Sequence, residues 1–392
     1  MKQKFTFQYA LQQIMLWAQY GCLFSYANPY LTQQLGLSDS AAGLVLGLAT
    51  GLSFLLQPLL ASAVDRSSLD ARKICLLTAL VNGLSCFAVV LIPGGATVSF
   101  AIACLTLQIL PSFSNAMGME AMRSGREINF AVARGIGSVS FGVFAKVTAL
   151  LIQRCGNQSV AVGGGIIALL FLLATLLFPT LEKEPHSHNT LDRSSGLFRR
   201  EPRFLLMIIA SVLLYVGHNA LCNYMFRVAE SKLAPPFIDR ATDLQGSALL
   251  IAAIAELPTM FLFTWMLKKV RCDIWLCLSC GFMTLRLLLT WLLPGEIGLL
   301  LTQVTQMGGY ALYAVASVYY VGTIMKKADV VKGQTYLGAS NTLGCLFAYV
   351  VGGVLIDKLG THAMLLTCLC LSVAGTALML CARQRVDRAV GT

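Results

Sequence analysis

Apolar runs of 18 or more residues recur along the whole chain, and they constrain its fold more than any other feature. About 20 apolar residues in helical conformation cross the hydrocarbon core of a bilayer. Backbone polar groups in lipid must be satisfied internally, so each run is predicted to be a helix; a barrel would show alternating segments of about ten residues. Charged residues are 12% of the chain, against about 25% in soluble proteins. The sequence therefore predicts an all-α membrane protein.

Twelve transmembrane helices are expected, joined by short polar loops. Only one hydrophilic stretch, residues 181–202, is long enough to be a linker, and six apolar runs lie on either side of it. We therefore expect an N-terminal six-helix bundle over 1–180, a solvated cytoplasmic linker over 181–202 and a C-terminal six-helix bundle over 203–392. The predicted spans lie at residues 7–33, 39–63, 73–93, 96–120, 130–153, 159–180, 203–228, 243–267, 273–294, 296–325, 333–356 and 361–382.

The placement of Lys and Arg predicts the orientation of these spans. With the N-terminus inside, 21 of the 29 basic residues fall on inner segments, five on outer segments and three within spans. Cytoplasmic loops carry the excess of basic residues in membrane proteins. We therefore expect a multi-pass protein of the cell membrane with both termini in the cytoplasm. The net charge of +11 belongs to loops between apolar runs, so nucleic acid is not the expected partner.

Two pairs of segments suggest that the halves repeat. Residues 37–52 parallel 243–257 when Gly43 is set on Gly246, an offset of 203, and residues 149–156 parallel 353–360 with an offset of 204. Nearly equal offsets from independent segments indicate a duplicated six-helix unit. Two such halves related by an axis along the membrane normal, with a site near the midplane between them, are typical of major facilitator transporters.

A paired acid and base flank one short basic loop in the first half. Glu120 ends the apolar segment before residues 123–127, and Arg134 begins the segment after them. A charge in apolar surroundings is costly and usually has both a partner and a function. The two side chains could share a cavity, or they could form an ion pair that only holds two helix ends together.

These segments resemble the lactose-permease-like sugar and nucleoside proton symporters of the major facilitator superfamily. NAMGMEA (115–121) and INFAVARGIGSVSF (128–141) are similar to helices 4 and 5 of that group. The resemblance implies that Glu120 and Arg134 bind substrate hydroxyls and that the Phe141 ring stacks on a sugar.

The second half carries further candidate positions for this resemblance. IAELPTMFLF (254–263) is similar to helix 8 of the group, GFMTLRLLL (281–289) to helix 9 and GHNALCNYMF (217–226) to helix 7 of the wider branch. These matches imply roles for Glu256, Arg286 and His218 in substrate binding or proton coupling. Residue chemistry leaves alternatives open: Glu256 and Arg286 could be a structural pair, and His218 a hydrogen-bonded packing residue.

The charged residues of helices 10 and 11 in the lactose permease pattern are absent here. Gln306, Gly309 and Asn341 occupy the positions that we match to them. Gln306 is therefore expected to contact substrate without titrating. The resemblance implies the fold and a substrate cavity, whereas the proton relay must use other residues, with Glu256 the leading candidate.

The first span carries a polar and aromatic stripe, which includes Gln12, Gln13, Trp17 and Tyr20. Such side chains suit ring stacking and hydroxyl contacts, so Gln12 and Trp17 are predicted to bind substrate. Helix packing would account for the same stripe. Lys146 lies twelve residues after Arg134 and about 120° around the helix from it, so its side chain could instead extend toward the outer interface.

Enzyme chemistry is not indicated by any motif. We find no phosphate-binding glycine loop, hydrolytic triad or metal-type Cys/His cluster, and the 13 cysteines lie mostly within apolar runs. No cofactor or metal is expected. The sequence predicts a monomeric secondary active transporter that moves a small polar solute, an oligosaccharide or nucleoside, by proton symport with alternating access. The alternatives are proton-coupled efflux of drugs or metabolites, and a membrane receptor or scaffold that does not transport.

Overall fold

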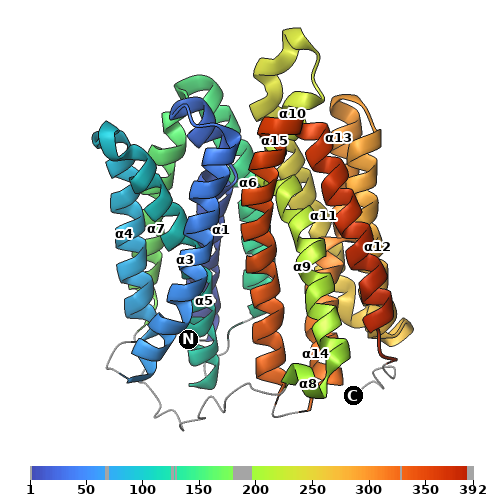
Figure 1. Ribbon diagram of the computed structural model, residues 1–392. Coiled ribbons are helices and arrows are strands. Elements are labelled where there is room, and N and C mark those ends of the chain that lie inside the picture. Colours follow the sequence, from blue (N-terminus) through green and yellow to red (C-terminus); the bar gives the residue numbers. More distant parts are fainter. Residues whose placement is uncertain are drawn as a thin grey trace. The chain divides into compact units, whose positions relative to one another are not determined.

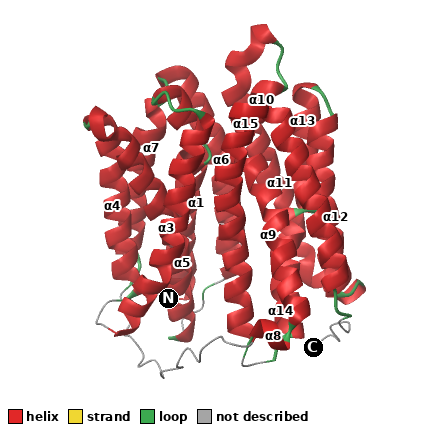
Figure 2. Ribbon diagram, viewed as in Figure 1, coloured by secondary structure: helices red, strands yellow, loops and turns green. Residues whose placement is uncertain are grey.

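The computed structural model describes residues 2–66, 70–124, 128, 130–179, 197–326 and 329–385. Within these ranges every regular element is a helix (Figure 2). Contacts between residues divide the chain into two compact units. Unit 1 comprises Met1–His188 and Thr242–Leu250, and unit 2 comprises Asn189–Ala241 and Ile251–Thr392.

Unit 1 is built from six long helical segments, of which the first continues through two π-helical turns (Figure 1). Helix α4 packs against α5 and α7, and α1 packs against α6 and α7. The segments are α1 (Lys2–Gln19) with η1 (Tyr20–Phe24), α2 (Ala27–Pro29) and η2 (Tyr30–Gln34), then α3 (Asp39–Arg66), α4 (Ala71–Leu91), η3 (Pro93–Gly95), α5 (Ala96–Arg123), α6 (Phe130–Cys155) and α7 (Gln158–Leu177).

Close approach of α1 and α6 depends on two glycines. A Cβ on Gly21 would lie 2.4 Å from the Phe141 carbonyl oxygen, and a Cβ on Gly137 would lie 2.4 Å from Cδ1 of Trp17. Small residues let membrane helices pack backbone against backbone. Gly137 therefore lets α6 pack against the Trp17 ring, and Gly21 of η1 packs against the backbone at Phe141.

Unit 2 contains the short helix α8, seven further α-helices and two short 3-10 helices, except for residues Thr242–Leu250 of α11, which belong to unit 1 (Figure 1). Helix α9 packs along α15, and α12 packs against α14 and α15. The elements are α8 (Leu197–Arg200), α9 (Pro202–Asn223), α10 (Met225–Ser231), η4 (Pro235–Arg240), α11 (Ala241–Lys269), α12 (Cys272–Leu292), α13 (Gly295–Val304), η5 (Thr305–Met307), α14 (Tyr310–Ile324) and α15 (Val330–Ala382).

Small residues at intervals of four line the α15 face that meets α9. They are Gly344, Ala348 and Gly352. A Cβ on Gly344 would lie 2.5 Å from the Tyr215 Cβ, and one on Gly352 would lie 2.7 Å from the Tyr224 ring. The Tyr224 hydroxyl donates to the Tyr349 carbonyl at 2.6 Å, so the close contact also satisfies a buried polar group.

Nine helices in the described part of the chain are long and apolar enough to cross a membrane. The helix boundaries follow the predicted spans, with three differences. The first predicted span includes π-turns, the span predicted at 203–228 is interrupted at Tyr224 between α9 and α10, and the span predicted at 296–325 is interrupted at η5. The last two predicted spans are the two helical parts of α15, which are separated at Gly360 by non-helical backbone with φ 83° and ψ 169°, a conformation that glycine adopts without a steric penalty.

The described end of the predicted linker is partly packed, with Arg199, Arg200 and Pro202 exposed. Leu197 of α8 is 2% exposed and joins the hydrophobic core of unit 2. The Phe198 ring lies 4.6 Å from the Tyr336 ring. Apolar residues at this end of residues 181–202 therefore anchor the chain where unit 2 begins, while residues 181–196 lie outside the described ranges.

Lys146 has a partner that sequence spacing did not reveal. Its ammonium pairs with Asp243 in the first turn of α11 and donates to the Ser247 hydroxyl at 2.9 Å. Gln245 donates to the Ser25 carbonyl at 2.7 Å. The start of α11, Thr242–Leu250, belongs to unit 1 because of such contacts. Lys146 therefore makes an ion pair instead of only extending toward an interface.

We expect Lys146→Ala and Asp243→Ala each to lower the melting temperature of the purified protein. The double variant should lose little beyond either single one, because both substitutions break the same half-buried pair. The coupling free energy from the double-mutant cycle should be about 0.5–3 kcal/mol. Strictly additive losses would show that the pair contributes nothing to stability.

Candidate functional site

A buried guanidinium is the centre of a polar network in unit 2. Arg286 on α12 is 2% exposed. Its Nη1 and Nη2 donate to the side-chain oxygens of Gln306 and Gln303, and Nη1 lies 3.4 Å from Nδ1 of His218. A buried charge is tolerated only when hydrogen bonds or counter-charges compensate for its lost hydration. The network supplies three neutral acceptors to this one cation.

Gln306 connects the guanidinium to a carboxylate. Its Nε2 donates to Oε1 of Glu256 at 2.9 Å, while its Oε1 accepts from Arg286. A guanidinium only donates and a carboxylate only accepts, so these two neighbours determine the amide orientation. Gln303 is oriented in a similar way, since its Nε2 donates to the Leu299 carbonyl at 3.0 Å. Glu256 and Arg286 were predicted as partners, and hydrogen bonds through Gln306 connect them.

The contacts of His218 define its tautomer. Because Arg286 can only donate, Nδ1 of His218 must accept, and the ring proton of the neutral imidazole is on Nε2. That nitrogen lies 3.8 Å from the Cys222 sulfur. The imidazole also stacks on the Tyr310 ring, with centroids 4.3 Å apart and planes 1° from parallel. These contacts position His218 tightly beside the guanidinium.

Irregular backbone lies beside this network on two helices. Pro258 interrupts the hydrogen bonding of α11 two residues after Glu256, and α13 gives way to η5 before Gly308 and Gly309. Thr259 donates to the Met307 carbonyl at 2.8 Å, which satisfies one acceptor at the break. Broken helices at membrane depth occur where they line a site or are buried in protein. Gln303 lies on α13 and Gln306 on η5, and both accept from the Arg286 guanidinium.

The structure thus brings together four residues that the sequence singled out: Glu256, Arg286, His218 and Gln306. Sequence reasoning missed Gln303, Cys222 and Tyr310. Gln303 could have been found, because it precedes Gln306 by three residues and so shares its helix face. Tyr310 and Cys222 carried no comparable signal, since their roles arise from contacts with His218.

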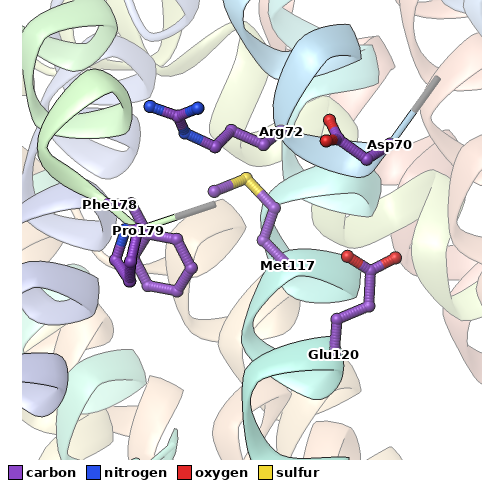
Figure 3. A pocket seen from close by; sticks show the side chains of 6 residues that line it. All are labelled: Asp70, Arg72, Met117, Glu120, Phe178 and Pro179. Carbon is purple, nitrogen blue, oxygen red and sulfur yellow. The ribbon is translucent and has the colours of Figure 1, made fainter. Parts of the chain in front are cut away.

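Glu120 lies in a different setting, where it lines a small pocket within unit 1 (Figure 3). Arg72 turns toward the end of α7, away from the carboxylates of Asp70 and Glu120. Its Nε and Nη2 donate to the carbonyls of Thr175 and Leu176 at 3.1 and 2.9 Å. Arg72 therefore caps a helix C-terminus. The other lining residues are Met117, Phe178 and Pro179.

The predicted pairing of Glu120 with Arg134 involves a side chain outside the described part of the structure. The backbone of Arg134 belongs to the first turns of α6, and Glu120 lies one turn before the end of α5. Each residue is therefore near the loop that joins the two helices, as the sequence predicted. Phe141 lies on α6 and is partly buried.

Gln12 and Gln13 are committed to hydrogen bonds inside unit 1. Gln12 is 0% exposed, donates to Thr175 Oγ1 at 3.2 Å and accepts from Ser114 Oγ at 3.1 Å. Gln13 donates to Ser114 at 2.8 Å and accepts from Trp17 Nε1 at 3.2 Å. These hydrogen bonds lie between packed helices, so they explain the glutamines of the first-span stripe without a bound substrate. Trp17 remains partly exposed beside them.

Long apolar helices in two units, with a buried charged network inside one of them, define a polytopic membrane transporter. Residues 7–368 match the MFS_1 like family, and the chain belongs to that family. No curated protein matches the chain.

Solved structures of transporters share the fold. The crystal structure of the nucleoside transporter NupG has a TM-score of 0.80 at 16% identity, covering 96% of this chain and 98% of that chain. A mutant of the peptide transporter POT has a TM-score of 0.74 at 11% identity, with 97% and 93% covered. An auto inhibited POT family peptide transporter has a TM-score of 0.71 at 11% identity, with 99% of both chains covered. These likenesses establish the major facilitator fold.

Proposed function

We propose that this chain is a secondary active transporter that moves a small polar solute across the cytoplasmic membrane by proton symport with alternating access. The observation that carries the proposal is the network joining Glu256, Gln306, Arg286 and His218 across α9, α11, α12 and η5. Ionisable groups inside membrane helices are expensive, and in transporters they mark substrate or proton pathways. A scaffold has no use for such a network.

An oligosaccharide or a nucleoside is the proposed solute. The fold shared with a nucleoside transporter supports this class, and so does the resemblance of the segments around Glu120 and Arg134 to sugar and nucleoside symporters. Trp17 and Phe141 would supply stacking surfaces, and Gln306 an amide for hydroxyl contacts. Gln12 was predicted to bind substrate, but its buried bonds favour a packing role.

Glu256 is the proposed proton-coupling group, with Arg286 and His218 as its partners. Glu256 is partly exposed, whereas Arg286 is buried. A proton can therefore reach the carboxylate by a route that does not pass the buried guanidinium. Uptake or loss of that proton changes the charge beside Arg286, and this change would bias the two states of an alternating-access cycle.

We further propose twelve spans in two pseudo-symmetric bundles, a cytoplasmic linker over 181–202, cytoplasmic termini and a monomer. The excess of Lys and Arg on one set of loops supports this orientation. A single-cysteine protein that retains only the exposed Cys155 should react with an impermeant thiol reagent from outside intact cells. A Ser195→Cys protein without other cysteines should not. The reverse pattern would overturn the orientation.

Uptake by purified protein in liposomes tests the function. With the interior made alkaline, the protein should accumulate a radiolabelled sugar or nucleoside, and an uncoupler should abolish the accumulation. A panel of sugars, nucleosides and cationic dyes separates the candidates. Dye transport out of cells without sugar or nucleoside uptake would favour the efflux alternative. Absence of transport of these solutes and of their acidic counterparts would overturn both.

A further inference from the structure

The charge balance around Arg286 indicates what kind of solute the site can bind. Its three acceptors, from Gln303, Gln306 and His218, are all neutral. The carboxylate in this network, Glu256, is joined to the guanidinium through the Gln306 amide. The buried Nε of Arg286 has no acceptor among the described residues. The guanidinium can therefore donate to a further acceptor. The carboxylate that balances its charge does not contact it directly, because the Gln306 amide lies between them.

We propose that the solute carries an acidic group, which compensates the charge of Arg286 when Glu256 takes up a proton. This inference rests on the proposed transport function and deepens it. With Glu256 ionised, the network has no net charge, because one carboxylate balances one guanidinium. With Glu256 protonated, it carries one positive charge in a membrane helix bundle. An anion restores neutrality, so the proton and the acidic solute enter together.

Arg286 suits this role chemically. A guanidinium presents several N–H donors in a planar fork that matches the geometry of a carboxylate or a phosphate. A neutral sugar or nucleoside offers hydroxyl and carbonyl acceptors but no compensating charge. In a weakly polar site an uncompensated charge is costly, so the protonated state should distinguish an acid from its neutral counterpart.

Other titratable groups face the same network. His218 and Cys222 lie on α9 and Tyr310 on α14, while among the described residues α13 and η5 contribute the two glutamine amides to the network. His218 is the group among them that titrates near neutral pH in its ordinary state. A His218→Gln variant therefore separates its contribution from that of Glu256.

Competition with matched probes tests the proposal. Glucuronate should raise the melting temperature of the detergent-purified protein at lower concentration than glucose does, or uridine monophosphate at lower concentration than uridine. The same acid should compete more strongly than its neutral counterpart for uptake into liposomes. The pair that responds identifies a sugar acid or a nucleotide as the source of the acidic group. The apparent affinity for the acid should rise as pH falls from 8 to 5.5, by up to about tenfold per pH unit for one linked proton.

Two variants should change the affinity for the acidic probe in opposite directions. Glu256→Gln should bind it tightly at every pH, whereas Gln306→Glu places a carboxylate beside Arg286 and should weaken its binding by roughly tenfold or more. His218→Gln should retain the pH dependence. If Gln306→Glu does not fold, the pH profiles of the parent and Glu256→Gln still decide.

Equal binding of the acid and its neutral counterpart, or affinity that does not change with pH, would overturn the inference. Uptake of neutral sugar or nucleoside in that case would leave the proposed transport function intact. Failure to transport any solute would overturn the transport function as well.

Discussion

The Glu256→Gln variant is expected to exchange solute across a liposome membrane at a rate near that of the parent but to lose accumulation against a gradient. Glutamine keeps the size of the side chain and can still bond to Gln306, while it cannot load or release a proton. Without that step the imposed pH difference no longer biases the transport cycle. Accumulation should fall at least about tenfold, to the level set by equal concentrations on both sides.

Two measurements on the same liposomes separate the effects. Counterflow of labelled solute reports exchange, and uptake with an alkaline interior reports accumulation. Glu296→Gln is a matched control, because its carboxylate pairs with Arg240 at 3.0 Å outside the network; it should leave both properties unchanged. Parental accumulation by Glu256→Gln would exclude Glu256 as the coupling site and favour His218, whereas a parent that exchanges solute without accumulating it would indicate uncoupled transport.

The Gly344→Ala variant is expected to destabilise unit 2 by about 1–3 kcal/mol, the range for overpacking in a close-packed interior. The added methyl would lie 2.5 Å from the Tyr215 Cβ, 3.0 Å from the Tyr215 carbonyl carbon and 3.1 Å from the Val216 nitrogen. Two of these atoms belong to the backbone of α9, so a side-chain rotation cannot relieve the clash. The two helices must move apart.

Gly338→Ala provides the control on the same helix. A Cβ at Gly338 meets no atom within 4 Å in the described structure, and alanine favours helix over glycine by about 0.5–1 kcal/mol. Thermal unfolding followed by fluorescence in detergent should show a lower midpoint for Gly344→Ala and an equal or higher one for Gly338→Ala. A parental midpoint in the Gly344 variant would show that α9 and α15 are less tightly packed than described.

Sequence patterns located most helices to within a few residues, because a run of apolar residues has only one way to satisfy its backbone in lipid. The start of α11 at Ala241 and the end of α12 at Leu292 lie close to the predicted limits. The candidate residues Glu256 and Arg286 were also identifiable, since charges are rare and costly within such runs.

Apolar runs in the sequence locate the long helices and the charged side chains that are rare within them. The partners of those side chains follow from tertiary contacts: Gln306 connects Glu256 to Arg286, Asp243 pairs with Lys146, and Ser114 and Thr175 hydrogen-bond to Gln12. Apolar length constrains a helix along its axis, because it sets which residues need an internally satisfied backbone. The rotation of a helix and its neighbours depend on packing between segments distant in the chain, so the sequence alone did not reveal these partners.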